Sequence, residues 1–179
     1  MLARLLRKKS IKKAARRIYD QLSLAAREPA LYGLGKVADT PDGRFELLAL
    51  HAAVLFTRLS KRGEQAEETS QEVFDILFSA MDHALRELGV GDISVGKRIR
   101  KLAESFYGRL AVYHDGIAGL GEDPDALSRA IAIHVFEVTT GYHPFAESLA
   151  NRILAWREQL AGQNDDELLA GNLVKPRHR

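Results

Sequence analysis

The chain has 179 residues, of which 46% are hydrophobic and 28% are charged. This size and composition suit one globular domain with a sizeable core and leave too little chain for a second full domain. The sequence contains no cysteine, which excludes disulfides, thiolate metal sites and cysteine nucleophiles. The longest strongly apolar run, residues 47–56, is too short to cross a bilayer, so we expect no transmembrane segment.

The formal net charge of +2 hides a strong asymmetry along the chain. Residues 1–17 carry eight basic side chains and no acid, which leaves 18 basic against 24 acidic side chains in the remainder. The sequence therefore predicts an acidic body with a basic arm. The arm lacks the apolar core of a secretory signal, although it shares the basic, acid-free character of a mitochondrial presequence. Its basic residues are Arg4, Arg7, Lys8, Lys9, Lys12, Lys13, Arg16 and Arg17.

The first helix is expected from about Ser10 to Arg27, with an apolar edge that begins at Leu2, Leu5 and Leu6. Two interpretations of its cationic first half stay open. It is either a solvated, partly frayed terminus or a surface that binds anionic lipid or RNA. Clusters of Lys and Arg are attracted to either partner, at about 1 kcal/mol per charge near a membrane surface. Composition does not separate lipid from RNA.

An irregular connection is predicted over residues 29–43, which contain two prolines and three glycines. Thr40 followed by Pro41 signals the start of a second helix that runs to about Lys61. His51 lies on the apolar face of this helix, where a histidine is more often a core residue than a ligand.

Two long helical patterns then form a hairpin, with a turn at Gly89 and Gly91. The first pattern, residues 64–88, is apolar over more than half of its circumference after Val73, so we expect it to be central, with neighbours on two sides. Its narrow polar strip carries Asp75 and the favourably ordered pair Asp82 and Arg86.

The second pattern of the hairpin continues to about Ile117 and contains Tyr107, Gly108 and Arg109. Gly108 falls on the polar side, where it is either merely tolerated or allows something to approach the backbone closely. Arg109 falls beside the apolar stripe and should need a carboxylate, for which Asp82 or Asp75 across the hairpin is the expected partner.

Further helices are predicted at residues 125–138 and from Pro144 to about Ala161, with a short one after Asn164. No β-strand alternation appears. The predicted fold is a single all-α domain, an irregular bundle of six or seven helices. We divide it into a basic arm (1–17), a helical domain (18–170) and a loose basic tail (171–179).

The search for catalytic chemistry is negative. The sequence has no zinc-binding HExxH, no P-loop, no GxGxxG after a strand and no serine in a nucleophile elbow. Asp123 and Asp125 flank a proline at a helix start, where capping explains them, and the six histidines have no ligand spacing. We therefore expect no enzyme, no cofactor and no metal site.

The hairpin carries a combined motif. It consists of Asp82, Leu85, Arg86, Gly89 and Asp92, the basic run 97–101, Phe106-Tyr107-Gly108-Arg109 and Tyr113. This motif resembles the ubiquinol–cytochrome c chaperone family, which assembles respiratory complex III. The start of the second helix resembles the same family at Arg44-Phe45-Glu46-Leu47 and His51.

The resemblance implies a non-enzymatic chaperone that binds newly made cytochrome b and supports its maturation. Mitochondrial relatives also act with a small partner protein and associate with the ribosome. The short basic arm, in place of a long targeting extension, suggests a bacterial member in the cytoplasm, peripheral on the inner membrane. No DNA partner is expected.

A client groove is expected between the apolar arc of residues 64–88 and the 29–43 segment, with Tyr107, Gly108 and Arg109 lining or bracing it. The alternative functions are a basic-arm RNA- or ribosome-binding protein and, more distantly, an all-α enzyme.

Overall fold

Helix α2 (Pro41–Leu59) is the centre around which the other long helices pack. It begins as predicted, because the Thr40 side chain accepts a hydrogen bond from the Gly43 backbone N–H at 3.1 Å and Pro41 occupies the first turn. Most of its residues are buried, and it contacts α1, α3, α4, α5 and α6. The central helix is therefore α2, which the sequence predicted only as one of several.

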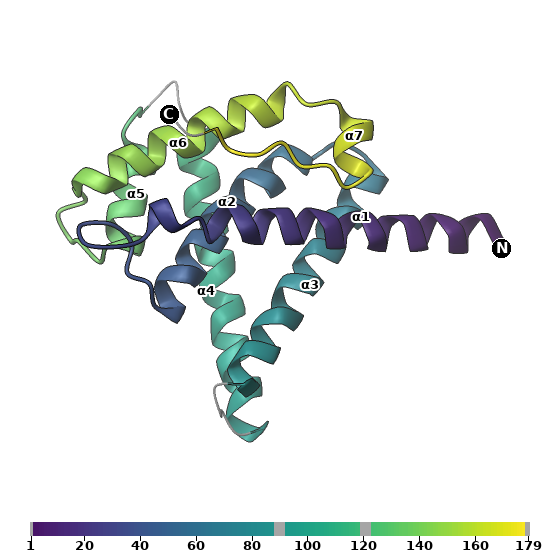
Figure 1. Ribbon diagram of the computed structural model, residues 1–179, viewed down its shortest axis with the longest axis horizontal. Coiled ribbons are helices and arrows are strands. Elements are labelled where there is room, and N and C mark those ends of the chain that lie inside the picture. Colours follow the sequence, from purple (N-terminus) through teal and green to yellow (C-terminus); the bar gives the residue numbers. More distant parts are fainter. Residues whose placement is uncertain (1, 88–91, 119–122, 178–179) are drawn as a thin grey trace.

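The computed structural model describes residues 2–87, 92–118 and 123–177, and these form an all-α bundle with no β-strand (Figure 1). This confirms the predicted fold class. The turn expected at Gly89 and Gly91 lies outside the described residues. The elements besides α2 are α1 (Leu2–Ala26), the short 3-10 helix η1 (Pro29–Leu31), α3 (Glu64–Glu87), α4 (Asp92–Ala118), α5 (Ala126–Val135), α6 (Pro144–Ala161) and α7 (Asp165–Leu169).

Helix α3 has neighbours on two sides, α1 and α4, as predicted, but the expectation that it is central was wrong. Its fully buried residues, Ala66, Thr69, Val73 and Leu77, all lie in its first two thirds. Beyond them α3 and α4 project together from the body as a hairpin (Figure 1), and apolar residues such as Leu85 are only half buried. The broad apolar arc remains partly uncovered because the other helices do not extend along the hairpin.

Helix α1 begins at Leu2, eight residues before the predicted start, so the basic arm is helical. Ile11, Ala14 and Ala15 are buried within the segment assigned to the arm, and α1 packs across α3. Its first turns extend past the rest of the molecule (Figure 1). The free part of the arm is therefore shorter than residues 1–17.

The segment after α7 is held in place, in contrast to the expected loose tail. The Trp156 indole N–H donates to the Val174 carbonyl at 2.7 Å. The Gln21 amide donates to the Gly171 carbonyl at 2.8 Å, and its oxygen accepts from the Leu173 N–H at 3.1 Å. Local sequence could not predict these hydrogen bonds, because the partners of the segment, Gln21 and Trp156, lie on α1 and α6.

Candidate functional site on helices α2 and α4

The core face of α4 is organised by Phe106, which is fully buried. Its ring lies 5.4 Å from that of Phe78, 5.9 Å from that of Phe74 and 6.5 Å from that of Phe56, measured between centroids. Aromatic pairs at these separations contribute about 0.5–1.5 kcal/mol each beyond their buried area. Phe106 thus joins α4 to both α2 and α3 near the base of the hairpin.

Arg109 is bound to a carboxylate, and the predicted partner was wrong. Its Nε donates to the two carboxylate oxygens of Glu46 on α2, at 3.0 and 2.9 Å. The Tyr113 hydroxyl donates to the same carboxylate at 3.3 Å. Arg109 does not bind Asp75 or Asp82, because its side of α4 faces α2 and not the polar strip of α3.

Burial dominates the electrostatics of this cluster. It raises the pKa of Glu46 above its usual value, although the hydrogen bonds from Arg109 and Tyr113 lower it. Burial also raises the pKa of Tyr113 well above 10, and the Glu46 hydrogen bond raises the pKa of Arg109. The Arg109 Nε lies 2.9 Å from a Glu46 carboxylate oxygen, and this ion pair joins α4 to α2.

The other predicted hairpin residues lie apart from this cluster. Asp82 accepts a hydrogen bond from Arg86 at 2.7 Å, as the spacing predicted, and Asp75 accepts one from Gln71 at 2.8 Å. All of these contacts are within the exposed strip of α3. The structure thus brings Tyr107, Gly108 and Arg109 together near α2 and leaves Asp75, Asp82 and Arg86 on a separate surface.

A shallow hollow of about 380 Å³ lies between α2 and α4. Tyr107 forms part of its lining, is 58% exposed, and has its ring 5.2 Å from that of Phe74. A Cβ placed on Gly108 would meet nothing within 4 Å, so the backbone of α4 is open there. The hollow is lined by Ala53, Phe56, Thr57, Ser60, Tyr107, Leu110, Ala111 and His114.

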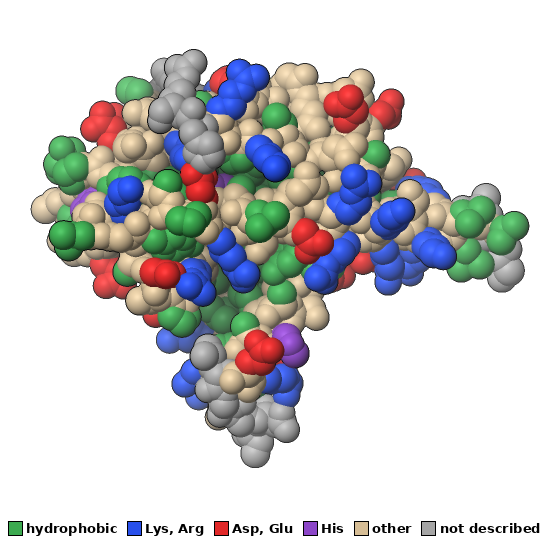
Figure 2. Space-filling model, viewed as in Figure 1, with side chains coloured by type: hydrophobic (Ala, Val, Ile, Leu, Met, Phe, Trp, Pro, Cys, Tyr) green, Lys and Arg blue, Asp and Glu red, His purple; other side chains and the backbone are tan. Residues whose placement is uncertain are grey.

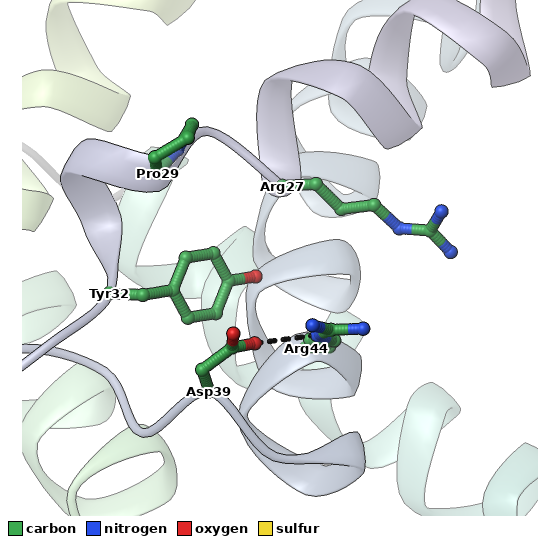
Figure 3. Close-up of a pocket in the computed structure, with 5 residues that line it drawn as sticks. All are labelled: Arg27, Pro29, Tyr32, Asp39 and Arg44. Atoms are coloured by element: carbon green, nitrogen blue, oxygen red, sulfur yellow. Dashed lines mark hydrogen bonds and ion pairs between the residues drawn. The ribbon is translucent and has the colours of Figure 1, made fainter.

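A second hollow, of about 280 Å³, lies by the 29–43 segment (Figure 3). It is polar. Asp39 binds Arg44 at 2.6 Å, which lowers the pKa of Asp39, and the Tyr32 hydroxyl donates to the Ala26 carbonyl. Figure 3 shows Arg27 extending away from the Tyr32 ring. Neither hollow combines α3 with the 29–43 segment, so the expected client groove is not found there.

His51 is a core residue, as predicted. It is fully buried, its Nδ1 lies 2.7 Å from the Leu47 carbonyl oxygen, and its ring lies 5.4 Å from that of Trp156. Within the described ranges, no group of three or more His, Asp or Glu side chains could hold a metal ion. No described helix is long and apolar enough to cross a bilayer.

The fold and this site define an all-α protein in which α2 and α4 are joined by a partly buried ion pair and one side of α4 stays uncovered. A family model described as ubiquinol–cytochrome c chaperone matches residues 35–175. The chain belongs to the ubiquinol–cytochrome c chaperone family and is an assembly chaperone of respiratory complex III.

The chain is also similar to a solved structure, the crystal structure of the Cbp3 homolog from Brucella abortus. The two share 34% sequence identity with a TM-score of 0.83, over 98% of this chain and 96% of that chain. No curated protein gives a match.

Proposed function

We propose that the protein binds newly made cytochrome b and supports its maturation into ubiquinol–cytochrome c reductase. It acts without catalysis, at the cytoplasmic side of a bacterial inner membrane. Membership of the chaperone family supports a client in complex III assembly. The client, the non-enzymatic mode of action and the location are what the proposal adds.

The observation that carries the proposal is the uncovered surface of α4 beside the hollow. Tyr107 and Val112 are exposed there, and Gly108 between them has no side chain. An exposed apolar surface usually marks an interaction site, and a glycine lets a partner backbone approach closely. An apolar segment of a membrane protein such as cytochrome b needs this kind of cover before it is assembled.

The Arg109–Glu46 pair gives this surface its rigidity. The pair fixes α4 on α2 from the buried side, while Tyr107 and Gly108 face outward. Arg109 therefore acts as a brace for the client surface, and Tyr107 and Gly108 form the surface itself.

The test is affinity capture of cytochrome b from solubilised membranes with tagged variants. We expect Tyr107→Ser and Gly108→Gln each to reduce the captured cytochrome b at least fivefold while melting as cooperatively as the unmodified protein. Tyr142→Ser is the matched control, because Tyr142 is an exposed tyrosine in the turn before α6. Equal capture by all three variants would show that this surface does not bind the client.

The second candidate, an RNA- or ribosome-binding protein, is favoured only by the basic arm. Arg4, Lys8, Lys9 and Lys13 form no ion pair with any residue in the described ranges, which leaves them available to phosphates. Salt-sensitive RNA binding that anionic lipid does not reproduce would support this candidate.

A further inference from the structure

We propose that the N-terminal end of α1 inserts end-first into an anionic lipid surface. The inserted part is the leucine tip, which we define as Leu2, Leu5 and Leu6. This inference deepens the membrane location in the proposed function, but it does not depend on the identity of the client.

The leucine tip faces away from the body of the protein. Its three side chains are between 60% and 72% exposed. At about 100° per residue, Leu2 and Leu6 lie roughly on the opposite side of α1 from the buried stripe of Ile11, Ala15 and Ile18, and Leu5 lies on the flank. The tip is therefore not a continuation of the packing edge, as the sequence suggested. Closer packing of α1 on α3 would not cover it.

The nearest charges suit a surface of phosphates. Arg7 and Lys12 pair with Glu64, Glu68 and Glu72 of α3, which holds this part of the arm against the body. Lys8, Lys9 and Lys13, without ion pairs to described residues, follow the tip by one or two helical turns, or roughly 5–10 Å along the axis. Figure 2 shows hydrophobic side chains at the end of the arm, with Lys and Arg behind them.

This order of side chains matches the layers of a membrane surface. Interfacial helices bury their apolar side chains about 5–10 Å deep, at the boundary of the headgroups and acyl chains. With the leucine tip at that depth, Lys8, Lys9 and Lys13 reach the level of the lipid phosphates. RNA offers the phosphates but no apolar layer, so it leaves the three leucines without a partner.

An end-first orientation follows from the rest of the same face. Leu24 lies at the angular position of Leu6 and is 71% exposed, but the charged residues Lys9, Lys13 and Asp20 lie between them on that side. A helix lying flat would have to bring these charges into the apolar layer along with the leucines. Inserting only the tip leaves these three outside. Arg4 lies within the tip, but its long side chain can extend back to the level of the phosphates.

The experiment is co-flotation of the purified full chain with vesicles of phosphatidylcholine, with and without 30% phosphatidylglycerol. Burying a leucine changes partitioning by about tenfold or more, so we expect Leu5→Ser/Leu6→Ser to abolish flotation. Leu24→Ser is the control on the same face and should float like the unmodified chain. Lys8→Gln/Lys9→Gln should weaken binding only to the anionic vesicles.

Three results would overturn the inference. The first is that Leu5→Ser/Leu6→Ser floats with the vesicles as well as the unmodified chain does, and the second is that Leu24→Ser loses flotation to the same extent as the double variant. The third is that RNA displaces the unmodified chain from the vesicles and binds both leucine variants as tightly as it binds the unmodified chain. The proposed function is scored separately, by cytochrome b capture in detergent. If the chain floats with vesicles but captures no cytochrome b, the proposed client is rejected and the membrane contact stands. If it captures cytochrome b but does not float, the membrane contact is rejected and the proposed client stands.

Discussion

The Glu46–Arg109 pair is poorly exposed to solvent, so breaking it should lower the free energy of unfolding. The side chain of Glu46 is 11% exposed and that of Arg109 is 26% exposed, so removing either partner leaves a poorly solvated charge. We expect Arg109→Met to lower the free energy of unfolding by about 2–3 kcal/mol, less than for a fully buried pair because Arg109 retains some solvent. Urea denaturation followed by circular dichroism measures this.

A double-mutant cycle distinguishes the pair from general packing. Adding Glu46→Gln to Arg109→Met should restore part of the loss, because the remaining charge is then removed. Arg86→Ala, which breaks an exposed pair on α3, should cost no more than about 0.5 kcal/mol. Strictly additive losses at Glu46 and Arg109 would contradict the brace.

His51 makes stability depend on pH. Burial lowers the pKa of His51 to about 4, while the same side chain in the unfolded chain has a pKa of about 6.5. The unfolded chain therefore binds a proton that the folded chain does not, and stability that is fully present above pH ~6.5 is lost as the pH falls toward about 4. The full loss is roughly 3 kcal/mol.

The variant His51→Phe should flatten this pH dependence, because phenylalanine keeps an aromatic ring beside Trp156 and does not titrate. Denaturation curves at pH ~7 and ~5 check the difference, with the exposed His83→Gln as the control. If the free energy of unfolding of the His51 variant changes with pH as much as that of the unmodified protein, other groups cause the pH dependence.

At the scale of the helix, two of the three glycines of α4 have opposite roles. A Cβ on Gly108 would meet open space, whereas a Cβ on Gly116 would lie 3.0 Å from the Cα of Leu127 on α5. We expect Gly108→Ala to stabilise the protein by about 0.5–1 kcal/mol and Gly116→Ala to destabilise it. Thermal melts of the two variants make the comparison, and a destabilising Gly108→Ala would mean that this position is strained or covered.

The elements that could be predicted are those set by local signals. Three such features are the Thr40–Pro41 start of α2, the Pro144 start of α6 and the Asp82–Arg86 pair, which depend on residues within one or two turns of each other. The partner of Arg109 and the close approach at Gly116 depend on which helix lies opposite. Sequence periodicity describes a face, but it does not identify the neighbour that covers it.

At the scale of the whole molecule, the predictions failed where the bundle ends. The pattern of α3 indicated a central helix. This prediction was wrong because periodicity does not tell how far the neighbouring helices extend. The resemblance depended on the motif in the α3–α4 hairpin, and the family match confirmed the family. That the arm is helical from Leu2, with leucines turned outward, followed only from the three-dimensional arrangement.

The hydrogen bonds between Gln21 and the segment after α7 join residues 150 positions apart. Helix α1 is synthesised well before residues 171–173, which fix its Gln21. At about 5–20 residues per second, a nascent chain waits roughly 8–30 s between these two events. During that interval α1 can pack on α2 and α3 but lacks its hydrogen bonds to the segment after α7. The order of synthesis therefore leaves this helix less fixed in the nascent chain than in the finished protein.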